Sequence, residues 1–131
     1  MPSILSNDTD QTSASEKAAQ SSALEGLLSV LLSAGYFRVR SPKLTPFDKV
    51  VGGLCWAITG SGVAVNVDVL YDEDLPLGAK IAVGENIVKA LRSMGCPAPL
   101  QSHQLQGGDY VGIFPAVQFL VKKVLEYRKV C

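Results

Sequence analysis

The sequence predicts an all-α protein, because apolar residues recur every three or four positions in four separate stretches. That spacing places them on one face of a helix, where they can pack into a core. Glycine and proline lie at the edges of these stretches, as they do where helices end and begin. The helices are expected near residues 22–34, 46–59, 77–94 and 113–128.

The length of 131 residues fits a single domain, since typical domains contain about 100 to 150 residues. Hydrophobic residues make up 47% of the chain and charged residues 18%, a balance typical of globular proteins. No apolar run approaches the roughly 20 residues of a membrane-spanning helix, and no signal peptide is recognisable, so we expect a cytoplasmic protein. The polar residues 1–21 are expected to form a flexible tail and residues 22–131 the domain.

The first predicted helix carries a stripe of leucines and stops at a glycine. Gly35 can adopt the left-handed conformation that commonly ends helices. Tyr36 and Phe37 follow at once, and both are expected to tuck under the helix end into the core. The stripe consists of Leu24, Leu27, Leu28, Leu31 and Leu32.

The second predicted helix has a recognisable start and two internal glycines. Thr45 can cap it, Pro46 suits the first helical position, and Asp48 adds a negative charge to the first turn. Gly52 and Gly53 each cost about 1 kcal/mol relative to alanine inside a helix. Their presence indicates that another element packs closely against that face.

Between the second and third main helices lies a stretch with a different period. Val63, Val65, Val67, Val69 and Tyr71 alternate with other residues, which is the pattern of a β-strand. No other strand-like run is available to pair with it, and an isolated hairpin is marginally stable in water. We therefore expect an extended or short β-like connector here.

The third and fourth predicted helices complete the core, with residues 96–99 expected to form a loop between them. One residue in every three or four along the four helices should be fully buried. The predicted buried residues are Leu28, Leu31, Val51, Leu54, Ile81, Val88, Leu91, Val117, Leu120 and Val124.

The chain shows no pattern typical of an enzyme, a cofactor site or a metal site. Its single histidine, His103, has no nucleophile or base at a characteristic spacing, and the glycines match no phosphate-binding loop. Cys55, Cys96 and Cys131 lie too far apart for a zinc motif and are expected to be reduced thiols. The sequence thus predicts a non-catalytic protein with no cofactor, no metal and no disulfide.

Three stretches resemble the N-terminal domain of the coiled-coil domain-containing protein 93 family. They are LLSAGYFRVR at residues 31–40, residues 41–58 with the core PFDKVVGG at 46–53, and HQLQGGDYVGIFPAVQFLVKKVLE at 103–126. The resemblance extends over roughly residues 24–128 and leaves out the first 22. The family's coiled coil has no counterpart in these 131 residues.

The resemblance implies a calponin-homology-like domain of the NN-CH group that binds proteins and catalyses nothing. Its family belongs to scaffolds of the Commander endosomal recycling assembly, which implies a cytoplasmic, endosome-associated protein active in protein transport. The implied partners are COMMD proteins, the coiled-coil domain-containing protein 22 family and Retriever subunits. With 12 basic and 12 acidic residues, the chain has no net charge to attract nucleic acid or a membrane surface.

Two surfaces are candidates for partner binding. The first is a polar loop with nearby aromatic residues, where amide and imidazole groups could exchange hydrogen bonds with a partner backbone. It comprises His103, Gln104, Gln106, Tyr110 and Phe119. The alternative assignment is structural, with His103 and the glutamines capping helices and bracing the loop.

The second candidate is a basic surface for acidic microtubules, as some NN-CH relatives use. It requires two groups of basic residues to merge into one patch. The residues are Arg38, Arg40, Lys43, Lys49, Lys122 and Lys123.

Overall fold

The computed structural model describes the backbone of residues 2–98 and 100–130 and the side chains of residues 14–98 and 100–129. Over these residues the chain is all-helical and contains no strand, which confirms the predicted all-α class. None of its helices, in that described part, is long and apolar enough to cross a membrane. The elements are α1 (Pro2–Ala34), η1 (Phe37–Arg40), α2 (Pro46–Gly60), α3 (Leu77–Ser93), α4 (Ser102–Gly107) and α5 (Tyr110–Val130).

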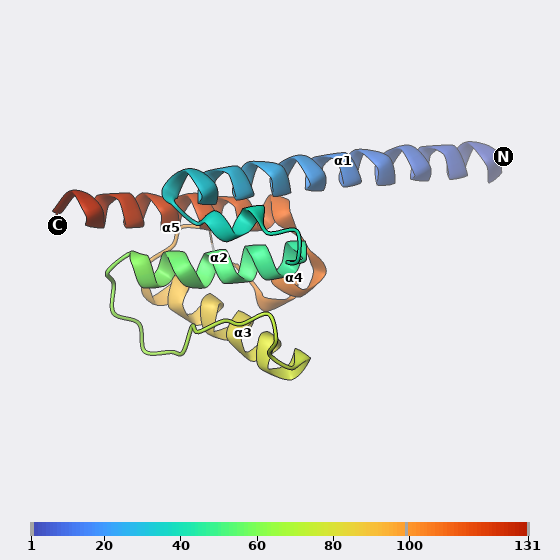
Figure 1. Cartoon of the computed structure of the whole chain (residues 1–131). Coiled ribbons are helices and arrows are strands. Elements are labelled where there is room, and N and C mark those ends of the chain that lie inside the picture. The colour runs from blue at the N-terminus through green and yellow to red at the C-terminus, as the bar shows by residue number, and fades with distance from the viewer. Residues whose placement is uncertain (1, 99, 131) are drawn as a thin grey trace.

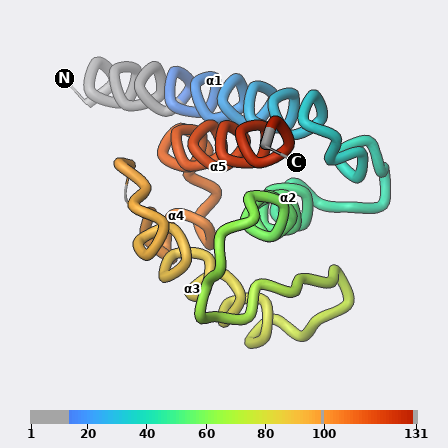
Figure 2. Tube along the Cα trace, turned by 90° about the vertical axis from the view of Figure 1, so that its left-hand side faces the viewer, coloured from blue at the N-terminus to red at the C-terminus, as the bar shows by residue number. Residues whose placement is uncertain are grey.

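The first and last helices lie side by side and run in the same direction (Figures 1 and 2). Gln20 contacts Asp109 near the start of α5, and Arg128 contacts Ala34 near the end of α1. Helix α2 lies beneath this pair, and α3 and α4 cover the other side of α2 and α5 (Figure 2). The core therefore gathers around α5, whose apolar face meets α1, α2 and α4.

Helix α1 begins much earlier than the leucine stripe predicted. The expected start near residue 22 is wrong, since the helix already includes the polar residues from Pro2 onward. The alanine, glutamate, lysine and glutamine residues at positions 14–20 are good helix formers, so a helix nucleated by packing can continue through them. The segment is thus helical where a tail without regular structure was expected, and residues 14–19 are exposed. The domain boundary at residue 22 stays a prediction.

The end of α1 confirms one prediction and corrects another. Gly35 has a positive φ of 114° and ends the helix as expected. Tyr36 is buried, but Phe37 is 66% exposed, so the expectation that both enter the core is wrong. The 3-10 turn η1 starts at Phe37 and turns successive side chains outward and inward, which buries Val39 instead.

The start of α2 and its glycines agree with the sequence predictions. Thr45 and Asp48 form a reciprocal capping box, with Pro46 at the first helical position. A Cβ atom at Gly52 would lie 2.5 Å from the Tyr36 hydroxyl, and one at Gly53 would lie 2.6 Å from Leu31. The glycines therefore let α1 and Tyr36 approach the α2 backbone.

Most of the predicted core is buried, with corrections at the edges of the stripes. Eight of the ten residues predicted to be buried are buried, while Leu28 and Ile81 are only half-buried. Leu77 and Leu125, which continue the α3 and α5 stripes in the sequence, are 69% and 44% exposed. Leu77 is the first residue of α3, and Leu125 lies off the buried face of α5, since its neighbour Val124 is fully buried. The helical spacing of apolar residues therefore identified which face of each helix points inward, but not which residues at the edges of that face are buried.

The connector between α2 and α3 forms no strand, yet its side chains alternate as in an extended chain. Val65, Val67, Val69 and Tyr71 pack against the core, while the residues between them are exposed. The alternation thus reflects one side of a single chain lying on α2 and α3 without a neighbouring strand. The β-like character of the connector is not confirmed.

Candidate functional site

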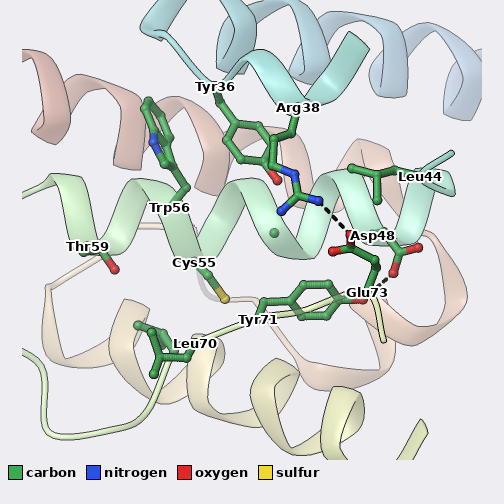
Figure 3. Close-up of a pocket in the computed structure, with 12 residues that line it drawn as sticks. Tyr36, Arg38, Leu44, Asp48, Cys55, Trp56, Thr59, Leu70, Tyr71 and Glu73 are labelled. Carbon is green, nitrogen blue, oxygen red and sulfur yellow. Dashed lines mark hydrogen bonds and ion pairs between the residues drawn. The ribbon is translucent and has the colours of Figure 1, made fainter. Parts of the chain in front are cut away.

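The candidate site is a groove that runs along α2, between η1 and the connector (Figure 3). It has a volume of about 290 Å³. Aromatic and charged side chains line it, and at its floor the Tyr36 hydroxyl lies against Gly52. We call it the α2 groove, lined by Tyr36, Arg38, Leu44, Asp48, Gly52, Cys55, Trp56, Thr59, Val69, Leu70, Tyr71 and Glu73.

A buried carboxylate, Asp48, fixes one end of the α2 groove. Its Oδ1 accepts hydrogen bonds from the Tyr71 hydroxyl and, at 3.0 Å, from the Lys80 ammonium. Its Oδ2 accepts a hydrogen bond of 2.9 Å from the Thr45 hydroxyl. One side chain of α2 thus holds the connector through Tyr71 and α3 through Lys80.

The protonation of Asp48 follows from these contacts. Burial by itself raises the pKa of Asp48, but the hydrogen bonds from Tyr71, Lys80 and Thr45 outweigh it and lower the pKa to about 2. Burial and the hydrogen bond to Asp48 raise the pKa of the Tyr71 phenol. At neutral pH Asp48 is therefore an ionised carboxylate that accepts a hydrogen bond from the neutral Tyr71 phenol. Both groups hold parts of the fold together.

Aromatic rings form the opposite wall of the α2 groove. The ring centroids of Tyr36 and Trp56 lie 5.5 Å apart at 42°. The Arg128 guanidinium lies 5.7 Å from the Trp56 ring and donates a hydrogen bond of 2.6 Å to the Ala34 carbonyl. This wall is thereby joined to both terminal helices.

An ion pair bridges the α2 groove near its open side. Arg38 Nη2 lies 2.8 Å from Glu73 Oε1, and the two side chains are 55% and 36% exposed. An exposed pair of this kind contributes at most about 1 kcal/mol, so a ligand with charges of its own can displace it.

The α2 groove combines aromatic rings, an exposed leucine and an exposed ion pair. Burial raises the pKa of the Cys55 thiol to about 12, so the thiol stays protonated. Over residues 14–98 and 100–129, no three His, Cys, Asp or Glu side chains come together as a metal site would need. Its remaining features are rings, an exposed leucine and a displaceable ion pair, which are features of protein interfaces.

The polar stretch predicted as a binding loop is instead the short helix α4. Gln104 is largely used within the fold, because its Oε1 accepts the Gln101 N–H and its Nε2 donates to Asp109. Asp109 also accepts a hydrogen bond from Gln20, so it joins α1 and α4 at the start of α5. His103 and Gln106 are exposed and remain open to a partner.

The two aromatic residues predicted alongside α4 do not complete a single site with it. Tyr110 begins α5 close to Gly108 and is half-buried. Phe119 lies nine residues further along α5, a rise of about 13 Å, where Lys123 sits 5.5 Å from its ring. Binding through these five residues stays a prediction, with Gln104 the member that has a clear structural role.

A family described as the CCDC93 protein N-terminal domain matches residues 18–126. The chain belongs to this family. The coiled-coil domain-containing protein 93 of Mus musculus is 47% identical over 114 residues, which cover 87% of this chain and 18% of that protein. The protein of the same name in Xenopus laevis is 45% identical over 122 residues, which cover 93% of this chain and 20% of that protein. A Dictyostelium discoideum homolog is 41% identical over 103 residues, which cover 79% of this chain and 16% of that protein. The chain thus spans a fifth or less of the length of these curated relatives.

Of the six basic residues considered for a cytoskeletal surface, Arg38 and Lys122 line two different grooves, and Lys123 lines neither of them. Arg38 lines the α2 groove and is paired with Glu73. Lys122 lines a separate groove between α1 and α5, together with Val30 and Lys129. The two grooves share no lining residue, and Arg40, Lys43 and Lys49 line neither of them.

The α2 groove was not predicted, although the sequence contained signs of it. The alternating valines showed that one side of residues 63–71 faces apolar surroundings, and Asp48 was read only as a helix-capping charge. The contacts of Asp48 with Tyr71 and Lys80 join residues 23 and 32 positions apart, a separation that no local pattern encodes.

Proposed function

We propose that this chain is a non-catalytic, calponin-homology-like protein-interaction domain of a coiled-coil scaffold in the Commander endosomal recycling assembly. Membership of the CCDC93 N-terminal domain family is the observation that carries the proposal. The proposed partners are COMMD proteins, with the coiled-coil domain-containing protein 22 family and Retriever subunits in the same assembly. The proposed location is the cytoplasmic face of endosomes.

Two features of the structure support a docking role. The α2 groove presents aromatic rings and an exposed leucine beside the Arg38–Glu73 ion pair, whose charges can pair with charges of a ligand instead. The titratable groups Asp48 and Cys55 are held by the fold in unreactive states. Such a surface favours binding a protein over transforming a small molecule.

The test is capture of purified COMMD proteins by the immobilised 131-residue chain. Concentration-dependent binding is expected, and its absence with every COMMD protein would contradict the proposed partners. Sedimentation with microtubules in the same buffer tests the cytoskeletal alternative, which retention of the chain on microtubules would favour.

The contribution of α4 can be separated from folding with a double variant. His103→Ala with Gln106→Ala removes two exposed side chains, so the melting temperature should stay within about 2 °C of the parent. Weaker COMMD capture at an unchanged melting temperature would assign these residues to the interface. A drop of several degrees with capture intact would assign them to the fold.

A further inference from the structure

We infer that the connector between α2 and α3 is an acceptor edge, a stretch of backbone that can form main-chain hydrogen bonds with an extended segment of a partner protein. In that segment apolar and basic residues alternate, and the segment binds in the α2 groove. The inference rests on the proposed docking function and adds to it a surface and the chemistry of the partner. Three arguments support it: the unpaired backbone, the direction inferred for that backbone, and charge.

The backbone of residues 63–71 is largely unpaired. Among the described residues, no backbone-to-backbone hydrogen bond involves this stretch. The side chains of Ser61, Asp68 and Asn86 satisfy three of its backbone groups. The chain bends at Asn66 and Val67, and of this stretch only Val69, Leu70 and Tyr71 line the α2 groove. There the remaining N–H and C=O groups form the kind of edge to which a second extended chain adds by main-chain hydrogen bonds.

The unpaired edge faces the α2 groove. The Asp68 carbonyl accepts a hydrogen bond of 2.9 Å from Asn86, so Asp68 directs its backbone toward α3. Backbone groups of neighbouring residues in an extended chain point to opposite sides. Val69 therefore directs its N–H and C=O away from α3, toward the groove that it lines.

The residues around this edge favour apolar side chains at alternate positions of the partner segment. Leu70 is 78% exposed at the rim, and Trp56 and Tyr36 form the opposite wall (Figure 3). Apolar residues at alternate positions of an added chain can contact these groups, because every second side chain points to the same face.

The acidic charge of the connector favours a basic partner segment and disfavours binding to a second copy of this chain. Residues 62–80 contain four acidic residues and one basic residue, Lys80, which is paired with Asp48 of α2. Three of these acids, Asp68, Asp72 and Asp74, are exposed. Two copies of this edge would repel each other, whereas lysine or arginine on the added segment would be attracted and could replace Arg38 beside Glu73.

The test uses a fluorescein-labelled synthetic peptide of alternating valine and lysine, with fluorescence anisotropy as readout. Binding to the 131-residue chain is expected. A peptide of the same sequence N-methylated at its central residues keeps its charge but loses its donors, and should bind about tenfold or more weakly. Equal binding of both peptides would show that charge alone drives association and would overturn the inference.

Variants of the protein test the same edge from the other side. Val69→Pro removes a backbone donor facing the groove and should weaken the peptide about tenfold, while the matched control Val69→Ala keeps the donor and should bind within about twofold of the parent. Melting curves show whether each variant folds. If Val69→Pro unfolds the domain, the N-methylated peptide still decides the question with the unaltered protein.

The outcomes also separate this inference from the proposed function. COMMD capture without peptide binding would overturn the acceptor edge and leave the docking function in place. Peptide binding without COMMD capture would support the edge and overturn the proposed partners. An alternating valine and glutamate peptide should not bind, and binding equal to that of the lysine peptide would overturn the charge selection.

Discussion

Asp48 shows how much of the structure can depend on one side chain. It caps α2 through Thr45, holds the connector through Tyr71, and holds α3 through Lys80. Because Asp48 is only 7% exposed, these contacts operate in surroundings where water screens them little. Removing the charge should therefore loosen the connector and the α2 groove together.

Stability should fall in acid because of Asp48. Its pKa is about 2 in the folded chain and 3.8 ordinarily, so its contribution is present above about pH 4 and lost as the pH falls through about 2. The shift corresponds to about 2 kcal/mol in the free energy of unfolding. Asp48→Asn should flatten this pH dependence in urea titrations, and Tyr71→Phe should flatten it in part. An unchanged slope in Asp48→Asn would assign the acid sensitivity to other carboxyl groups.

The paired glycines of α2 give a second prediction at the scale of single residues. Gly53→Ala places a Cβ 2.6 Å from Leu31, a fully buried residue with little room to move, and should destabilise the chain by about 1 kcal/mol or more. Gly78→Ala on α3 meets nothing within 4 Å and should stabilise by up to about 1 kcal/mol. Thermal melts of the two variants should shift in opposite directions.

At the scale of helices, burial on α5 depends on the face of the helix to which a residue belongs. Leu120 is fully buried between α5 and its neighbours, whereas Leu125, on the same helix, is 44% exposed. Both residues are apolar, but Leu120 shares the buried face with Val124, whereas Leu125 lies off that face. Their energetic contributions should differ accordingly.

Leu120→Ala should cost about 2 to 5 kcal/mol, since it leaves a cavity in the core. Leu125→Ala is the matched control on the same helix and should cost less than about 1 kcal/mol. Urea denaturation of both variants measures the difference. A loss below about 1 kcal/mol for Leu120→Ala would mean that its face of α5 is not packed as described.

Sequence patterns predicted the elements that local rules determine and missed those that depend on distant contacts. The capping box of Thr45, the stop at Gly35 and the inward faces of α2 and α5 follow from neighbouring residues. Helix α4 was missed because its apolar signal is a single buried leucine, Leu105, and its capping residues looked like a binding loop. Phe37 was misplaced because the direction of a 3-10 turn is not encoded in its composition.

At the scale of the whole molecule, α1 and α5 join the two ends of the fold. Gln20 contacts Asp109 at one end of the pair, and Arg128 contacts Ala34 and Trp56 at the other. The candidate site therefore depends on the last helix, although α5 contributes no lining residue to the α2 groove.

Arg128→Ala tests this long-range connection. The variant loses a hydrogen bond to the Ala34 carbonyl and a cation–π contact with Trp56, and should be destabilised by about 1 to 3 kcal/mol. Lys129→Ala changes an exposed neighbour and should stay within about 0.5 kcal/mol of the parent. Trp56 fluorescence should report the loss, and identical spectra for both variants would contradict the contact.

The pairing of the first helix with the last also governs when this chain can fold during its synthesis. Hydrogen bonds between α1 and α5 connect residues 89 to 94 positions apart, so the leucine face of α1 has no α5 to cover it until nearly the whole domain has left the ribosome. At about 5 to 20 residues per second, that interval lasts roughly 5 to 20 s. Closing so long a loop also slows folding of the finished chain. The nascent domain should therefore present an apolar helix to chaperones for several seconds before its core can close.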